Sequence, residues 1–194
     1  MAEKIKRIKE SITEIEFKKL MSYIRGDESI RKNTRDNLLR TFIFLYFSGL
    51  RLNEVQELKI KDVKNLLDEG MIKVYVSKTS SERKIYLSTS FKKEIEKVFD
   101  FTSEDDENRV IYKSVNKKDK INNIVFIQQV NSKMKEILGS GFTSHSFRQG
   151  LITEMGSKSI NVKIISNFIG HKNVSTTLGY IRPTDEQIRD ALVR

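Results

Sequence analysis

The amino-acid sequence predicts an α+β fold that is mainly helical and contains one small three-stranded antiparallel sheet. Most apolar residues recur every three or four positions, which is the spacing of an amphipathic helix. Only short segments alternate between apolar and polar residues as strands do. A chain of 194 residues is long enough to bury a core, and it corresponds to one domain or to one domain with an arm.

The first helix is predicted after a charged lead-in at residues 1–10. Thr13 and Glu16 fit a capping box, and an apolar face at helical spacing follows them. Gly26 and Asp27 mark the end of this helix.

A second helix is predicted over about 33–47. Its core sequence, LLRTFIFLYFSGL, is apolar nearly all round, which is typical of a buried helix. Ser48 and Gly49 end it, and a short helix is expected at 52–59.

A β-hairpin is predicted in the middle of the chain. Residues 71–77 and 83–88 alternate in polarity and include β-branched residues, and the polar turn 78–82 joins them. Residues 110–114, with the sequence VIYKS, are expected to form the third strand. The loop that precedes them, 101–109, is acidic.

The remaining elements are predicted to be helices. The only proline, Pro183, separates the last of them from the others, because proline cannot continue a helix. Their approximate ranges are 90–100, 120–138, 143–155, 159–169, 173–180 and 184–193.

The charge of the chain favours a polyanionic partner. The formal net charge is +10 at pH 7 and the pI is about 9.6. Each phosphate that a lysine or arginine neutralises releases counterions, so this surplus favours nucleic acid. A merely lysine-rich, well-solvated surface explains the charge about as well. A membrane surface fits poorly, because no segment is both strongly basic and apolar on one face.

The composition also excludes several kinds of site. The chain has no cysteine, so disulfides, thiolate zinc sites and a cysteine nucleophile are excluded. Its two histidines, His145 and His171, are 26 positions apart with no His-x-x-x-His motif, which makes a metal hydrolase a weak hypothesis. The charged N-terminus does not resemble a secretory signal and no apolar run could span a bilayer, which indicates a soluble intracellular protein.

Two arginines stand at positions suited to bind a phosphate. Arg51 follows the glycine turn after the second helix, where a rigid helix end can aim its planar fork, and Glu54 is one turn further on. His145 and Arg148 are three residues apart and therefore share one face of a helix. Taken alone, Arg51 fits an exposed arginine better, and His145 with Arg148 fits a satisfied polar pair equally well.

Tyr180 and Lys78 are the other candidates. The segment GHKNVSTTLGY places Tyr180 nine residues after His171. A lone tyrosine near a C-terminus is usually a core or rim residue. Lys78 lies where the first strand enters the hairpin turn, and a lysine there is usually solvated but can also reach into a groove and donate a proton.

Together these motifs resemble the tyrosine recombinase (phage integrase) family. Their order is Arg-x-x-Glu after a helix-ending glycine, a hairpin lysine, His-x-x-Arg, Gly-His and a tyrosine, over roughly residues 11–190. The resemblance implies the catalytic-domain fold of that family and cleavage and rejoining of DNA strands through a 3′-phosphotyrosyl intermediate. It also implies that no cofactor and no metal are needed. Ser48 departs mildly from the family, which usually has threonine there.

The resemblance implies a role for each motif residue. Arg51 and Arg148 correspond to the pair that clamps the scissile phosphate and offsets charge in the transition state. Tyr180 corresponds to the nucleophile. Lys78 corresponds to the general acid that protonates the leaving 5′-oxygen, and Lys84 is a neighbouring alternative.

Three further residues complete the implied site. His145 corresponds to a residue that transfers a proton with the tyrosine hydroxyl, His171 to one that contacts the phosphate and positions the tyrosine, and Glu54 to a supporting residue. The chemistry agrees with these roles. A phenol with a pKa of about 10 is a poor nucleophile at neutral pH, and nearby guanidinium groups favour its ionised form.

The resemblance also implies domain limits and partners. Residues 11–182 form the expected catalytic domain and 183–194 a C-terminal tail, and the family's upstream core-binding domain is expected to be absent. The expected partner is double-stranded DNA, with a monomer in its absence and a homotetramer on it. The C-terminal helix either enters a neighbouring protomer or packs on its own domain. The expected place of action is the cytoplasm at the nucleoid, or the host cell of a virus or mobile element.

Two alternative functions remain open. A type IB topoisomerase shares the chemistry but relaxes supercoils without exchanging strands, and the small size and short tail favour the recombinase. A DNA-binding regulator that has lost catalysis is the other alternative, and the intact set of motif residues argues against it.

Overall fold

The computed structural model describes residues 10–76 and 81–181, together with Arg189 and Leu192. Within this part of the chain, no helix is both long enough and apolar enough to cross a bilayer. The elements in chain order are α1 (Glu14–Gly26), α2 (Lys32–Ser48), α3 (Leu52–Val55), α4 (Ile60–Glu69), β1 (Met71–Val76), β2 (Ser81–Tyr86), α5 (Thr89–Glu96), α6 (Asn123–Leu138), α7 (Ser144–Ser157), α8 (Val162–Ile169) and α9 (Val174–Leu178).

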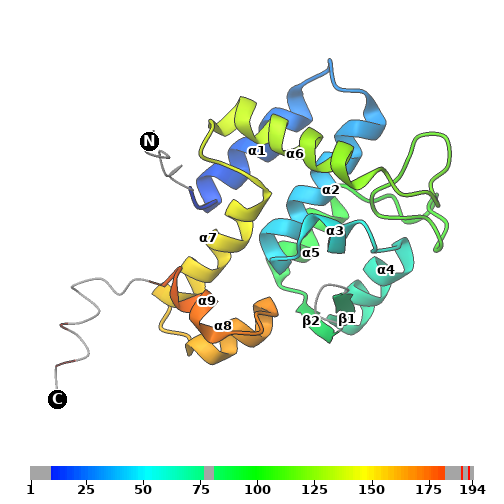
Figure 1. The fold of residues 1–194 in the computed structure, drawn as a ribbon. Coiled ribbons are helices and arrows are strands. Elements are labelled where there is room, and N and C mark those ends of the chain that lie inside the picture. The colour runs from blue at the N-terminus through cyan, green and yellow to red at the C-terminus, as the bar shows by residue number, and fades with distance from the viewer. Residues whose placement is uncertain (1–9, 77–80, 182–188, 190–191, 193–194) are drawn as a thin grey trace.

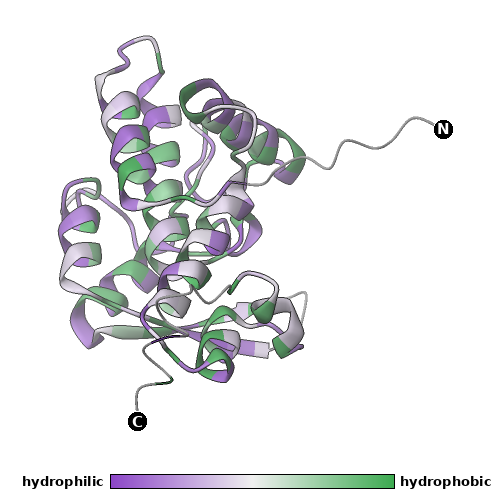
Figure 2. Cartoon of the chain, turned by 90° about the vertical axis from the view of Figure 1, so that its left-hand side faces the viewer, coloured by the Kyte–Doolittle hydropathy of each residue, from purple (hydrophilic) through white to green (hydrophobic). Residues whose placement is uncertain are grey.

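The central helix of the fold is α2, against which α1, α3, α5 and α7 pack (Figure 1). Phe42, Phe44 and Leu45 of α2 are fully buried, which confirms the prediction of a buried helix. In Figure 2 the outer helices carry both hydrophilic and hydrophobic residues, as expected for helices with one buried side. The helix ends at Gly49, whose φ of 60° is a left-handed conformation that glycine adopts readily.

The first helix starts at the predicted capping box. The backbone N–H of Thr13 donates to Oε2 of Glu16 at 2.9 Å, and the Thr13 hydroxyl accepts from the backbone of the first turn. The helix ends at Gly26, as the sequence indicates.

One helix, α4, was not predicted. Its buried residues are Ile60, Val63 and Leu66, which recur every three positions and form its apolar face. The backbone N–H of Lys59 donates to the carboxylate of Asp62 at 2.8 Å and so starts the helix. This spacing is the signal that predicts α4 from the sequence.

The predicted hairpin is present, with β1 antiparallel to β2. Its register pairs Met71 with Tyr86 and Val76 with Ser81. The second strand therefore begins at Ser81, and the predicted turn 78–82 was too long. Residues 77–80, which include Lys78, lie outside the described part of the chain.

The prediction of a third strand at 110–114 was wrong, because the sheet in the described residues has two strands. Arg109 forms only an isolated bridge with Lys59. Further on, the backbone of Tyr112 is satisfied by a side chain instead of a neighbouring strand. Asn37 of α2 donates from Nδ2 to the carbonyl oxygen of Tyr112 at 2.8 Å and accepts from the backbone N–H of Tyr112 at 3.3 Å.

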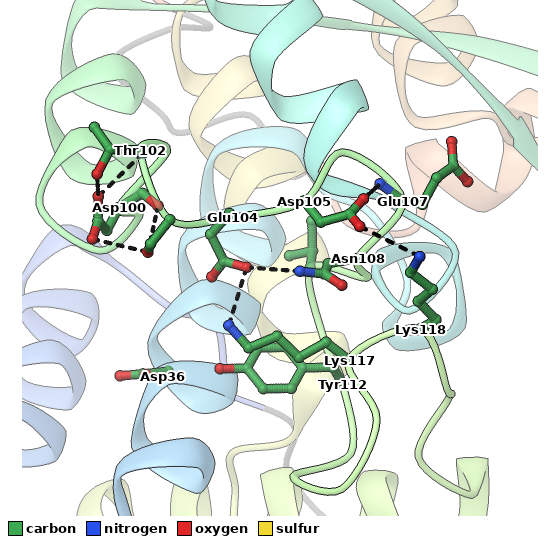
Figure 3. A network of polar contacts seen from close by, with 12 residues as sticks. Asp36, Asp100, Thr102, Glu104, Asp105, Glu107, Asn108, Tyr112, Lys117 and Lys118 are labelled. Carbon is green, nitrogen blue, oxygen red and sulfur yellow. Dashed lines mark hydrogen bonds and ion pairs between the residues drawn. The ribbon is translucent and has the colours of Figure 1, made fainter.

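The acidic loop 101–109 is held against α2 by a buried polar network (Figure 3). Glu104 is nearly inaccessible, and its carboxylate lies 2.7 Å from the guanidinium of Arg40. Lys117 and Asn108 also approach this carboxylate, each at 3.4 Å. A buried charge pair of this kind needs such hydrogen bonds to offset its desolvation, and here they fix the loop in place.

A second, smaller core joins α7, α8 and the segment after α9. It contains Ile152, Ile165 and Ile169, and Phe168 and Ile181 pack at its edge. In Figure 1, α7 runs from the α1 and α6 end of the molecule toward α8 and α9. This core therefore places the C-terminal motifs beside α7.

Candidate active site

The predicted residues Arg51, Glu54, Arg148 and His171 come together at one place in the fold. Glu54 binds Arg51 twice, with 2.7 Å between Oε1 and the guanidinium Nη1 and 2.9 Å between Oε2 and the backbone nitrogen. The Nε–H of Arg148 donates to Nε2 of His171 at 3.4 Å. Arg51 also contributes to lowering the pKa of both Arg148 and His171, which places its charge near them.

Two helix ends hold Arg148 in place. Its Nη1 donates to the carbonyl oxygen of Gly49 at 2.8 Å, and its Nη2 donates to the carbonyl oxygen of Ile169. Gly49 follows α2 and Ile169 ends α8, and the C-terminal carbonyls of a helix carry partial negative charge. Gly170, with a φ of 75°, closes α8 in the left-handed conformation. The SGLR and Gly-His motifs thus lie at the ends of α2 and α8, and carbonyl groups at these two ends bind Arg148.

The pKa of Arg148 is lowered to about 9. Burial is the main cause, followed by repulsion from Arg51 and Arg83, while Glu54 and Tyr180 act in the opposite direction. The group keeps its positive charge at neutral pH. It is therefore a buried cation for which a bound anion would compensate.

A third arginine, Arg83, belongs to this cluster and was missed by the sequence analysis. It lies on β2, only 5% exposed, and its Nη1 lies 3.9 Å from Oε2 of Glu54. Burial lowers its pKa to about 10. One signal in the sequence could have identified Arg83. It lies on the face of the strand that alternation predicts to be buried, and a buried arginine needs a partner.

The hydrogen bonds of His171 determine its tautomer. Because the Nε–H of Arg148 can only donate, Nε2 of His171 must accept, and the ring proton lies on Nδ1. Nδ1 lies 2.9 Å from the hydroxyl oxygen of Thr177, to which it donates. Burial, reinforced by Arg148, Arg51 and Arg83, lowers the pKa of His171 to about 4, so the imidazole is neutral at pH 7.

The hydroxyl residues between His171 and Tyr180 do not cap α9. Asn173 caps it, with its side-chain oxygen 2.8 Å from the backbone nitrogen of Ser175. Thr177 is instead fully buried against the imidazole. The segment therefore positions the histidine rather than starting the helix.

Tyr180 follows Gly179, the C-cap of α9, and is 38% exposed. Its carbonyl oxygen accepts from the hydroxyl of Thr153 on α7 at 3.4 Å. The next residue, Ile181, packs so closely on Gly156 of α7 that a Cβ there would lie 3.0 Å from Ile181 Cγ1. The tyrosine is thus docked beside α7 of its own chain.

His145 stands in the first turn of α7, whose N-cap is Thr143. Its side chain is exposed, and it precedes Arg148 by three residues, so the two lie on the same side of the helix. Lys84 is exposed on the face of the hairpin opposite to Arg83, across from Lys73. The strand geometry turns Lys84 away from the arginine cluster.

In residues 10–76 and 81–181, no group of three or more His, Cys, Asp or Glu side chains could hold a metal ion. The positive charge of the cluster comes from Arg51, Arg83 and Arg148.

The chain is similar to known proteins over nearly its whole length. The tyrosine recombinase XerA of Pyrococcus horikoshii is 30% identical over 187 residues, which cover 96% of this chain and 61% of the relative. A crystal structure of XerA recombinase superposes with a TM-score of 0.70 at 22% identity, covering 93% of this chain and 63% of that one. A structure of the Tn1549 transposon integrase in complex with a circular intermediate DNA has a TM-score of 0.69 at 19% identity. The match covers 98% of this chain and 67% of that one. The sequence profile of the phage integrase family matches residues 10–187, and the chain belongs to that family.

Proposed function

We propose that this chain is the catalytic part of a site-specific DNA recombinase or integrase that cleaves and rejoins strands through a 3′-phosphotyrosyl intermediate. The observation that carries the proposal is the convergence of the guanidinium groups of Arg51, Arg83 and Arg148, the last of which is near enough to Tyr180 of the same chain for the tyrosine to affect its pKa. Such a cluster suits a phosphodiester, which guanidinium groups bind with paired hydrogen bonds. The chain spans 61% of the length of the XerA relative, so the activity is proposed from the residues of the site described above.

In the proposed reaction the Tyr180 oxygen attacks the phosphorus of one DNA strand. The bond from phosphorus to the 5′-oxygen breaks, and Lys78 donates a proton to that oxygen. The products are a 3′-phosphotyrosyl ester and a free 5′-hydroxyl. Attack by the 5′-hydroxyl of another strand on the ester reverses the step, so the bond energy is conserved without a nucleotide cofactor.

The remaining residues stabilise the charge that develops. Arg51 and Arg148 bind the non-bridging oxygens, because both are fixed before the phosphate arrives. Both ring nitrogens of the neutral His171 are engaged, by Arg148 and by Thr177, so His171 fixes Arg148 beside the phosphate and orients Tyr180 through the turn that follows Thr177. His145 exchanges the proton of the tyrosine hydroxyl, and Glu54 supports Arg51.

A covalent-adduct assay tests this proposal. The assay uses duplexes with a randomised core and a nick in one strand. After cleavage, the short fragment that carries the new 5′-hydroxyl diffuses away, so the adduct accumulates. We expect an SDS-resistant protein–DNA species that mass spectrometry locates on Tyr180, and sequencing of the adducts identifies the preferred site. Tyr180→Phe should bind the same DNA without forming the adduct. An adduct that persists in Tyr180→Phe, or none in the wild type at saturating DNA, would contradict the proposal.

The DNA site recovered in this assay also distinguishes a recombinase from a type IB topoisomerase. Strand exchange between two duplexes that carry the recovered site supports a recombinase. Relaxation of a supercoiled plasmid that lacks the site, without strand exchange, would favour a type IB topoisomerase.

We also propose that the chain is a monomer without DNA and assembles as a tetramer on it. Residues 11–182 would form the catalytic unit, and the tail 183–194 would enter a neighbouring protomer. Leu192, an apolar residue of this tail, is 75% exposed in the single chain, which supports exchange over packing on its own domain. Deletion of 184–194 should weaken assembly on DNA and leave the monomer folded, as sedimentation with and without DNA would show.

The proposed substrate also implies where the enzyme acts. We place it at the nucleoid of the cell that carries it, or at the DNA of a host cell if the chain belongs to a mobile element.

A further inference from the structure

Arg83 is the most deeply buried cation of the site. Its Nη1 donates to the carbonyl oxygens of Ile169 at 3.0 Å and Gly49 at 3.3 Å, and its Nη2 donates to the carbonyl oxygen of Ser48. One side chain on β2 therefore joins the C-terminal ends of α2 and α8, which belong to different parts of the chain.

Two of these carbonyl groups also bind Arg148. The Gly49 oxygen accepts from Arg148 at 2.8 Å as well as from Arg83, and the Ile169 oxygen accepts from both. The two guanidinium groups therefore share a pair of acceptors. The segments that follow these acceptors lead to Arg51 and to His171, so the position of the shared carbonyls determines how far apart the catalytic side chains lie.

This arrangement is costly for stability. Burial lowers the pKa of Arg83, its Nε–H has no hydrogen-bond partner in the described structure, and Arg148 and Arg51 lie close enough to repel it. A whole buried ion pair can often be replaced by apolar side chains with little loss of stability, whereas removal of one partner alone destabilises the fold. The partial negative charge of two helix C-termini, together with Glu54, offsets the cost.

We propose that Arg83 is a positioning residue for the reaction: by holding the ends of α2 and α8 together, it sets the distance between Arg51 and the Arg148–His171 pair. Both of its terminal nitrogens donate to carbonyl groups at the ends of α2 and α8, so its role is to hold these helix ends. An arginine is required here, since its planar fork reaches three carbonyl oxygens and a lysine ammonium cannot span them. This inference rests on the proposed function.

The test compares Arg83→Met, which removes the charge, and Arg83→Lys, which keeps it, with Lys73→Met. Lys73 is an exposed lysine on the outer face of the same hairpin, so its variant controls for the loss of one positive charge. On the DNA site recovered from the adduct assay, we expect Arg83→Met to slow single-turnover adduct formation about 100-fold, since a misplacement of about 1 Å costs that much. The Kd for DNA should change less than about 3-fold, and Arg83→Lys should recover only part of the rate.

A structural role alone gives a different pattern. If Arg83 only holds the hairpin in the fold, Arg83→Met should lower the melting temperature while adduct formation, measured well below that temperature, stays within about 3-fold of the wild type. That result would overturn the proposal. If Arg83→Met fails to fold, Arg83→Lys is used instead, and adduct formation within about 3-fold of the wild type would likewise overturn the proposal.

A second measurement needs no DNA and so separates this proposal from the proposed function. The chain has two histidines, so the ring signals of His145 and His171 are readily distinguished by NMR. We expect Arg83→Met to shift the ring signals of His171 and leave those of His145 unchanged, while Lys73→Met changes neither. Unchanged His171 signals in both Arg83 variants would overturn the positioning role even if the wild type forms the adduct. If the wild type forms no adduct but the His171 signals shift, the proposed reaction fails and the coupling between Arg83 and His171 stands.

Discussion

The Nε–H of Arg148 donates a hydrogen bond to Nε2 of His171 across 3.4 Å, and this contact places the imidazole proton on Nδ1. Burial, reinforced by the charge of Arg148, keeps the pKa of the ring low and the ring neutral. A protonated imidazole would place two N–H donors against each other. The arginine that is expected to bind the phosphate therefore also determines the tautomer of the histidine beside it.

The first prediction concerns the pH dependence of His171. Its pKa in the folded protein is about 4, below the ordinary value of 6.5 in the unfolded chain. Between these values the unfolded chain binds the proton first, so the contribution of His171 to stability is present above pH 6.5 and is lost as the pH falls toward 4. NMR titration should show the low pKa. In His171→Gln, the free energy of unfolding should decrease less between pH 7 and 5 than in the wild type. A measured pKa near 6.5 would contradict the burial of the imidazole beside the three arginines.

The second prediction concerns the docking of the nucleophile on α7. In Gly156→Ala the added Cβ would lie 3.0 Å from Ile181 Cγ1, so Ile181 must move and Tyr180 with it. We expect adduct formation to slow about 10-fold with little change in stability, because the neighbouring atoms belong to a flexible side chain. Gly26→Ala is the matched control, since its Cβ would meet nothing within 4 Å. Equal adduct rates for the two variants would argue against this docking.

The third prediction concerns Gly150, two residues after Arg148. A Cβ at this position would lie 2.0 Å from the carbonyl oxygen of Ile12, which crosses α7 there. The backbone of the crossing segment cannot move freely, because the N–H of Ile12 donates to the carbonyl oxygen of Ser146 at 3.1 Å. Gly150→Ala should therefore destabilise the fold by more than about 2 kcal/mol in denaturant unfolding. A loss as small as that of Gly26→Ala would show that the crossing is not tight in solution.

The fourth prediction separates the two candidates for the general acid. Replacing the leaving 5′-oxygen of the DNA with sulfur gives a leaving group that needs no proton. Lys78→Ala should lose most cleavage of ordinary DNA and regain it on the sulfur substrate. Lys84→Ala should cleave both substrates like the wild type, because Lys84 lies on the outer face of the hairpin. Rescue of Lys84→Ala by sulfur instead would assign the role to Lys84.

Much of the fold was predictable because local signals agreed with the tertiary structure. The capping box of Thr13 and Glu16, the buried α2 and the glycine after it are all present. The third strand was wrongly predicted because β-branched residues at 110–114 indicate burial as well as pairing. Here the backbone of Tyr112, in the middle of this segment, is satisfied by the side chain of Asn37, a partner remote in sequence.

The sequence by itself determined the family motifs and the residues that carry them, since the order and spacing of Arg51, Arg148, His171 and Tyr180 are properties of the chain. Only the tertiary structure decided how these residues are held. It brought the ends of α2 and α8 together, made their carbonyl groups the shared acceptors of Arg148 and Arg83, and turned Thr177 toward His171. The alternation of β2 indicates that Arg83 is buried and needs partners, but no local pattern identifies these partners, because they are backbone carbonyls, which every residue carries and which become available only where a helix ends.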